Sequence, residues 1–197
     1  MSLRPFREGL EASIRTDRAV RPFVCDGSPL HCRAFIVGIN AASDVSFWRF
    51  WDDETGFDKK RWYERYRAQR AGVDKKPVSP TRQRIGRIVC AAAPVPILET
   101  NLYSVATAKA GDLKENDKRT DVIEFLLREV SPRVLLLHGK AVKEHFERLC
   151  GHTLTPCFSS ATIYGRPVKI AAVRQLAYVS YEGASKLGET IRSLVAE

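Results

Sequence analysis

Four short apolar runs, each continuous rather than alternating with polar residues, constrain the fold of this chain more than any other sequence feature. They cover residues 33–38, 95–100, 133–138 and 168–174, and segments with helical periodicity separate them. Continuous apolar strands are typical of parallel sheets, because helices cover both faces of such a sheet. The sequence therefore predicts an α/β fold with three layers, α/β/α, around a central four-stranded parallel sheet.

The segments between these runs show where helices are expected. Ser79 followed by Pro80 is a typical helix start, since serine caps the first turn and proline fits the first helical position. This helix is expected to reach residue 93. Asn116 is expected to cap a second helix, which has apolar residues at 122, 123, 126, 127 and 130 on one face. Other helices are expected over residues 6–18, 139–149 and 182–195.

The size and the charge of the chain bound its class. Its 197 residues are expected to form a single domain, residues 1–197, whose core is large enough to need neither disulfides nor a structural metal. Lys and Arg number 32 against 23 for Asp and Glu, which gives a net charge of +9. This excess favours a polyanionic partner, because basic side chains release counterions when they neutralise phosphates. An ordinary basic protein is the alternative interpretation.

Several kinds of site are disfavoured by the motifs that the sequence lacks. The five cysteines include no pair at zinc-knuckle or redox spacing, so we expect reduced thiols, no metal and a cytoplasmic location. No glycine-rich dinucleotide motif or P-loop motif occurs, and we expect no cofactor. No stretch reaches the ~18 apolar residues of a membrane span, so a membrane is not an expected partner.

Residues at the carboxyl ends of the expected strands are the first candidates for a functional site, because open parallel sheets bind ligands there. Asn40 follows the first strand and Asn101 the second. Each asparagine has a second interpretation as a turn residue whose side chain satisfies the backbone. The other candidates at these ends are Gly38, Ile39, Ala41, His138, Lys140, Arg174 and Gln175, and an aromatic cluster with Phe47 and Trp48 follows the first strand.

The order of these residues resembles the uracil-DNA glycosylase superfamily. Gly38-Ile39-Asn40 is similar to the first motif of the mismatch-specific thymine/uracil branch, which reads Gly-Ile-Asn-Pro-Gly. Residues 50–58, with the sequence Phe-Trp-Asp-Asp-Glu-Thr-Gly-Phe-Asp, are similar to a run found in an uncharacterised bacterial subgroup. The resemblance spans residues 33–180 and implies a uracil-DNA glycosylase-like fold. It also implies the removal of uracil or another deaminated base from DNA.

The resemblance implies a role for each candidate residue. An enzyme of this kind extrudes a nucleotide from the stack and holds its base. Asn40 would position the attacking water, and Asn101 would read the base through one donor and one acceptor. Phe47 or Trp48 would stack on the base, although both rings have an alternative role in the core. The substrate-binding set implied here is completed by Gly38, Ile39, Ala41, His138 and Gln175.

The chain departs from the family pattern at two strand ends. Ala41-Ala42 replaces the usual Pro-Gly, and Arg174-Gln175-Leu176 stands where many members carry His-Pro-Ser. We expect Arg174 to stabilise the departing base electrostatically. Leu176 or Tyr178 is expected to insert into the duplex as a wedge.

Basic residues suggest where DNA would be held. Residues 60–76 are dense in Arg, Lys and aromatic residues, and Arg61, Arg67 and Arg70 are expected to contact phosphates. A solvated helix with internal ion pairs is the alternative. The start of the helix at His138-Gly139-Lys140 is expected either to bind an anion or to form a tight turn.

Three functions are compatible with these residues. The leading hypothesis is a monofunctional DNA glycosylase, a hydrolase that acts on damaged or mismatched DNA and leaves an abasic site. The second is a non-catalytic protein that binds nucleic acid or a base with the same fold, which the two departures motivate. The third is an enzyme that acts on nucleosides or nucleotides.

Overall fold

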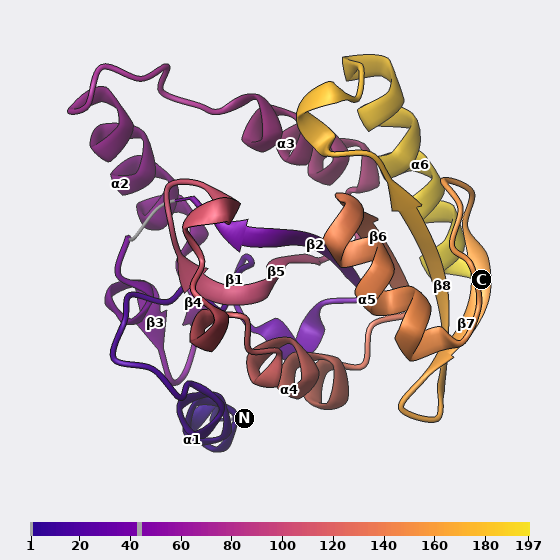
Figure 1. Cartoon of the computed structure of the whole chain (residues 1–197), viewed down its shortest axis with the longest axis horizontal. Helices are drawn as coiled ribbons and strands as arrows, with labels where there is room; N and C mark the ends of the chain where they lie inside the picture. The colour runs from indigo at the N-terminus through magenta and orange to yellow at the C-terminus, as the bar shows by residue number, and fades with distance from the viewer. Residues whose placement is uncertain (1, 43–44) are drawn as a thin grey trace.

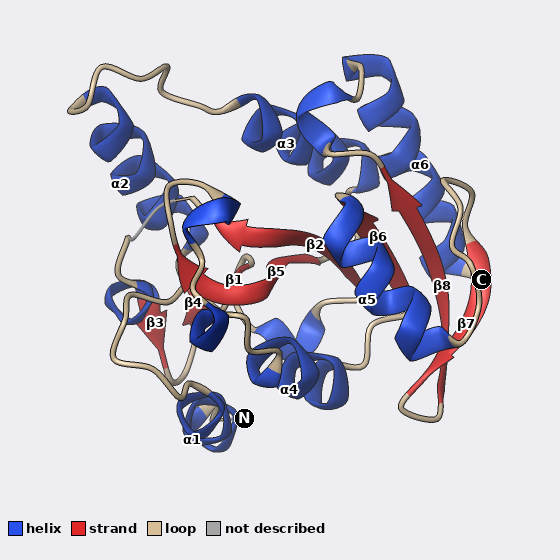
Figure 2. Cartoon of the chain, in the orientation of Figure 1, coloured by secondary structure: helices blue, strands red, loops and turns tan. Residues whose placement is uncertain are grey.

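A six-stranded, mostly parallel sheet with helices on both faces forms the body of the protein in the computed structural model, which describes residues 2–42 and 45–197 (Figures 1 and 2). The order of the strands is β1-β5-β2-β6-β8-β7. The strands of this sheet are β1 (Phe23–Val24), β2 (Ala34–Ala41), β5 (Ile97–Ala106), β6 (Val134–His138), β7 (Ser159–Ile163) and β8 (Arg166–Val173). A separate hairpin consists of β3 (Trp51–Asp52) and β4 (Gly56–Phe57).

The four predicted strands are the parallel part of this sheet, in the order β5-β2-β6-β8. The sheet has six strands rather than four because β1 and β7 pair antiparallel at its edges. Both edge strands lack a continuous apolar run. β1 has two residues, and in β7 the buried Ala161 and Ile163 alternate with exposed polar residues, which is the pattern of a strand with one solvated face.

Six α-helices lie among the described residues: α1 (Arg4–Ser13), α2 (Lys59–Ala71), α3 (Pro80–Ala92), α4 (Asp121–Val130), α5 (Lys140–Cys150) and α6 (Tyr181–Ala196). The Ser79 side chain caps α3 by accepting from the backbone N–H of Arg82, as the sequence predicts. Asn116 does not cap α4. The Asp117 carboxylate instead accepts from the N–H of Lys114 at 2.8 Å and closes a 3-10 turn over Glu115–Asp117, so that α4 begins only after Thr120.

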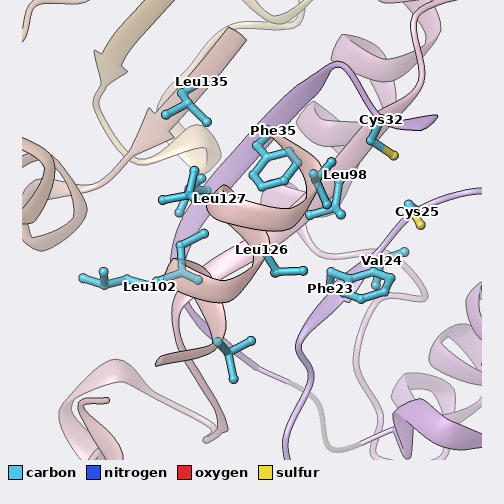
Figure 3. Close-up of a cluster of buried hydrophobic side chains, with 14 of the residues drawn as sticks. Phe23, Val24, Cys25, Cys32, Phe35, Leu98, Leu102, Leu126, Leu127 and Leu135 are labelled. Atoms are coloured by element: carbon cyan, nitrogen blue, oxygen red, sulfur yellow. The ribbon is translucent and has the colours of Figure 1, made fainter. Parts of the chain in front are cut away.

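Two apolar clusters hold the helices to the sheet. On one face, Ile36 and Leu136 pack with Ile88 of α3 and Ile191 of α6. The other face is covered by α1, α4 and α5, and Figure 3 shows Phe35 of β2 with leucines of β5 and α4 in its cluster. Among the residues described, no helix combines the length and the apolar character that crossing a lipid bilayer requires.

The face beneath α3 and α6 changes from apolar to polar along its strands. Residues two apart in a strand point to the same side of a sheet, so Ile36 is followed on this face by Gly38 and Asn40, and Leu136 by His138. On β5, Asn101 pairs with Gly38 in the parallel register. The polar residues therefore lie together at the carboxyl ends of the parallel strands.

Candidate functional site

A cavity of about 580 Å³ opens at the carboxyl ends of β2, β5 and β6. Its floor includes Asn40, Asn101 and His138, each from a different strand. Tyr66 of α2 and Arg82 of α3 contribute to one wall. The volume lies within the ~300–1,000 Å³ range of small-molecule sites, so the cavity is large enough for a base together with its sugar.

Gly38 lets two polar side chains approach each other over β2. A Cβ atom at this position would lie 2.8 Å from Nε2 of His138 and 3.1 Å from Oδ1 of Asn101. The first distance is shorter than carbon contacts permit, so any side chain at Gly38 would displace the imidazole. The glycine is therefore required for a close approach rather than for a turn.

The side chains of Asn101 and His138 are buried but not paired. They are 7% and 9% exposed, and neither has a hydrogen-bond partner among the described residues. Buried polar groups in proteins are nearly always hydrogen-bonded. Two such groups on the floor of one cavity are therefore suited to bind a polar ligand.

The imidazole of His138 is neutral at pH 7. Burial, with a smaller contribution from the positive charge of Arg82, lowers the pKa of His138 to about 4. A neutral imidazole presents one donor and one acceptor. His138 therefore offers hydrogen-bonding capacity to the cavity without a positive charge of its own.

The amide of Asn40 is held in one orientation by Thr107. Its Nδ2 donates to Oγ1 of Thr107 at 2.7 Å and to the carbonyl oxygen of Thr107 at 3.2 Å. The Thr107 hydroxyl in turn donates to the carbonyl oxygen of Lys109. Within the described part of the chain, Oδ1 of Asn40 accepts no hydrogen bond. It is therefore a fixed acceptor at the edge of the cavity.

Both asparagines lie inside strands rather than in turns. Asn40 belongs to β2 and pairs with Tyr103, and Asn101 belongs to β5 and pairs with Gly38. Neither residue is therefore a turn residue, although the Asn40 amide does serve the backbone by donating to the carbonyl oxygens of Ala41 and Thr107. The expected strand ends fall short because both strands continue past their apolar runs.

A buried ion cluster forms part of the cavity wall. The Glu99 carboxylate pairs with the guanidinium of Arg82 and, at 2.8 Å, with Nζ of Lys59. Burial lowers the pKa of Arg82 to about 9 and that of Arg21 to about 10, so both remain charged at neutral pH. Arg21 and Arg82 both line the cavity, which gives this wall a positive potential.

Several candidates from the sequence meet in this cavity. The lining includes Ile39, Asn40, Asn101, His138, Gln175 and Arg70. Gly38 lies directly below Asn101 and His138. Ala41 is fully buried, and Ala42 lines the cavity in its place.

The two aromatic candidates lie away from the cavity. The ring of Phe47 is 2% exposed and stacks on Phe57 with ring centroids 5.0 Å apart. Trp48 packs edge-on against Phe47, and the Arg7 guanidinium lies over its ring. The 3-10 turn Phe47–Phe50 directs these rings toward the core. The aromatic ring that does line the cavity belongs to Tyr66.

The residues after β8 are also distributed differently from the sequence prediction. Arg174 is exposed and lies outside the lining of the cavity. Leu176 is fully buried against the α3 and α6 cluster, whereas Tyr178 is 68% exposed. In this conformation only Tyr178 of these two is available as a wedge.

The other predicted DNA contacts lie on exposed helix surfaces. Arg61 and Arg67 are exposed on α2, and Arg61 lies 3.9 Å from the Asp58 carboxylate. Lys140 is exposed at the start of α5, with its Nζ 3.7 Å from Glu144. Only Arg70 of these cations reaches the cavity.

Sequence reasoning missed several contributors to the site, among them the cations Arg21, Arg82 and Lys109. It also missed Tyr66 and Lys75, from α2 and the segment after it, and Thr107, which directly follows β5. The sequence signal for Tyr66 is its spacing of four residues from the fully buried Trp62, which places both rings on one face of α2. No local signal marks Thr107, because its role depends on the pairing of β5 with β2.

Comparison of the sequence with models of protein families finds no match, and comparison with curated proteins finds none either. In the described residues, no three His, Cys, Asp or Glu side chains gather in a way that suits a metal ion. The chemistry of the cavity is therefore read from its own amide, imidazole, hydroxyl and guanidinium groups.

Proposed function

We propose that this protein is a DNA glycosylase that removes uracil or another deaminated base by hydrolysis of the N-glycosidic bond. The observation that carries the proposal is the convergence of Asn40, Asn101 and His138 from three strands on one cavity. In this proposal the fold is uracil-DNA glycosylase-like. Four parallel strands between two helix layers support that assignment.

The unpaired groups of the floor suit the edge of a pyrimidine. Uracil presents an N–H donor flanked by two carbonyl acceptors. The amide of Asn101 supplies one acceptor and one donor, and the neutral ring of His138 supplies a further donor. Because a site built to hydrogen-bond its ligand rejects analogues that leave its polar groups unpaired, this floor favours uracil over an apolar ligand.

Asn40 suits the positioning of the attacking water. An amide is not basic enough to remove a proton, but its fixed Oδ1 orients a water molecule toward the sugar carbon C1′. The C1′–N bond breaks as the C1′–O bond forms. The base leaves with the bonding electrons and takes up a proton from solvent, and the water loses one. The positive charges of Arg21 and Arg82 stabilise the developing anion.

Features outside the floor suit a polynucleotide. Arg70, Lys75 and Lys109 add positive charge to the lining of the cavity, where phosphates on either side of an extruded base would pass. Gln175 lines the cavity, and Tyr178, three residues further along the chain, is exposed. Its ring is available to fill the gap that base extrusion leaves in the duplex.

The decisive experiment is a cleavage assay on oligonucleotides that carry one uracil opposite guanine, opposite adenine or in a single strand, with alkali to reveal abasic sites. We expect cleavage by the wild type and a loss of about 100-fold or more in Asn40→Ala, because the water is no longer oriented. Asn116→Ala is the matched control, since Asn116 is exposed and outside the cavity. The proposal fails if the folded wild type cleaves no uracil-containing substrate, or if Asn40→Ala cleaves at the wild-type rate.

One observation favours a second candidate, an enzyme that acts on free nucleosides or nucleotides. The cations Arg21 and Arg82 are buried at the cavity wall. A continuous DNA backbone runs along a protein surface, so a small nucleotide that enters the cavity whole would reach these buried cations more easily. Such an enzyme breaks the same bond with the same floor residues. Release of uracil from deoxyuridine or its monophosphate, without cleavage of oligonucleotides, would select this candidate.

A further inference from the structure

One wall of the cavity is built from alternating guanidinium groups and aromatic rings. The guanidinium of Arg82 lies 5.0 Å from the ring centroid of Trp62 and 6.0 Å from that of Tyr66. Arg21 lies 5.5 Å from Trp62, and Arg70 lies 5.7 Å from Tyr66. The two rings themselves stack at 5.4 Å. Stacking on aromatic faces holds the planar guanidinium groups in fixed orientations.

Two of these guanidinium groups, those of Arg70 and Arg82, have N–H donors that are not used in hydrogen bonds to the described residues. Arg82 donates through Nη1 to Glu99, and Arg70 donates through Nε to the carbonyl oxygen of Lys76 at 2.7 Å. The remaining N–H groups of Arg70 and Arg82 meet no acceptor among the residues that the structure describes. Both residues line the cavity, so these donors are available to a ligand inside it.

The charge of the cavity is not balanced by its described residues. Arg70, Lys75, Arg82 and Lys109 contribute cations to the lining, and Lys75 and Lys109 among them are exposed. Glu99 is the one carboxylate among the described lining residues, and Lys59 and Arg82 already neutralise it. Like charges gathered around one cavity repel one another, and an anion bound among them relieves this repulsion. An anionic group on the ligand would provide that compensation.

We propose that Arg70 and Arg82, together with Lys75, form a subsite for the phosphate group of a nucleotide whose base contacts Asn101 and His138. This inference rests on the proposed function, in so far as the floor binds a base. Phosphate is the anion that matches the donors, because a guanidinium offers parallel N–H groups at the spacing of two phosphate oxygens. The phosphate has two possible sources, a free nucleotide monophosphate or the backbone of DNA beside an extruded nucleotide.

The subsite is tested by the affinities of deoxyuridine and deoxyuridine 5′-monophosphate, measured by calorimetry at low salt. We expect the monophosphate to bind the wild type at least about tenfold more tightly, and Arg70→Gln or Lys75→Gln to remove most of that difference, since one charge-assisted hydrogen bond is worth about a factor of ten or more. Arg65→Gln is the control, because Arg65 is exposed on the same helix and outside the cavity lining. Deoxyuridine affinity should be unchanged in all three variants.

A second arm addresses the DNA backbone as the source of the phosphate. Uracil-containing oligonucleotides are compared with versions in which a neutral methylphosphonate replaces the phosphate on the 5′ or 3′ side of uracil. If the backbone occupies the subsite, one replacement weakens binding to the wild type about tenfold and has little effect on Arg70→Gln. If a free nucleotide occupies the subsite, Arg70→Gln weakens the binding of deoxyuridine 5′-monophosphate, and the methylphosphonate replacements have little effect on the binding of oligonucleotides.

The subsite is overturned if neither arm shows a phosphate preference, or if Arg70→Gln and Arg65→Gln behave alike in both. These outcomes are independent of cleavage. A wild type that cleaves uracil from DNA without any such dependence loses the subsite and keeps the proposed function. A protein that cleaves no substrate but shows a phosphate preference that depends on Arg70 keeps the subsite and loses the proposed function.

Discussion

The Asn40 amide nitrogen lies 2.7 Å from the hydroxyl of Thr107, a residue that is 67 positions away in the chain and joins it only through the pairing of β2 with β5. This contact determines which end of the amide faces the cavity. It therefore connects the pairing of two strands to the chemistry that we propose for Asn40.

Replacement of Thr107 by valine should reduce the cleavage rate more than it reduces substrate affinity. Valine keeps the shape of threonine but loses the hydroxyl, so Asn40 loses its shortest hydrogen bond and is held only by the longer ones to backbone carbonyl oxygens. We expect kcat to fall about fivefold, in line with the ~1 kcal/mol of one hydrogen bond, with KM nearly unchanged. Thr107→Ser keeps the hydroxyl and should retain most of the activity. Full activity in Thr107→Val together with a loss in Thr107→Ser would mean that the methyl group, and not the hydrogen bond, matters.

Replacement of Gly38 by alanine should damage the cavity. The added methyl group overlaps the His138 ring, so either the imidazole or strand β2 must move. We expect a loss of about 1–3 kcal/mol in the free energy of unfolding, as for other overpacked sites, and weaker binding of deoxyuridine. Gly86→Ala is the control: no atom lies within 4 Å of the added carbon in α3, and alanine is favoured in helices by about 1 kcal/mol. Urea unfolding and calorimetry measure the two effects.

The stability of the protein should depend on pH through His138. Its folded pKa of about 4 lies below the ordinary value of 6.5, so between these pH values the unfolded chain binds a proton that the folded protein does not. The free energy of unfolding therefore falls as the pH falls through this window, by up to about 3 kcal/mol. Urea unfolding at pH 7 and pH 4.5 should show a smaller decrease for His138→Asn than for the wild type.

The matched control for this titration is His152→Asn, because His152 is an exposed histidine. This variant should follow the wild type at both pH values. An equal decrease in the wild type and in His138→Asn would show that the proton is taken up elsewhere.

Removal of the Tyr178 ring should affect duplex substrates selectively. The ring is exposed and packs on nothing in the core, so we expect Tyr178→Ala to change the free energy of unfolding by less than about 0.5 kcal/mol. Cleavage of uracil in a duplex should fall about tenfold or more, and cleavage in a single strand should not change, since only the duplex must be unstacked. Leu176→Ala is the contrasting variant: it should lose about 2–5 kcal/mol of stability.

The sequence predicts the parallel strands well because a continuous apolar run records burial on both faces, and burial is what the fold imposes there. The expected runs at 33–38 and 133–138 coincide closely with β2 and β6. The extension of β2 to Ala41 escapes this reasoning because the polar Asn40, which lines the cavity, interrupts the apolar run. The edge strand β1 escapes it because two residues carry no periodicity.

The sequence predicts the part of the cavity lining that comes from strand ends, and not the part that comes from helices. Asn40, Asn101 and His138 follow from the architecture, since parallel strands bring their carboxyl ends together. The opposite wall depends on how α2 and α3 pack: the spacing of Tyr66 from Trp62 places the Tyr66 ring on the buried face of α2, but no local pattern shows that Arg82 meets it there. The direction of the Phe47 ring depends on a short 3-10 turn, and aromatic composition alone does not distinguish a ring in the core from a ring in a pocket.

One sheet face is divided into an apolar half under α3 and α6 and a polar half that lines the cavity, and selection acts differently on the two halves. Ile36 and Leu136 hold the helices, whereas Gly38 and His138, two residues further along the same strands, belong to neither apolar cluster. Substitution of Asn101 or His138 by another polar residue of similar size therefore alters which ligand is accepted while the helices keep their anchorage. A scaffold arranged in this way can acquire a new specificity through single replacements at the floor of its cavity.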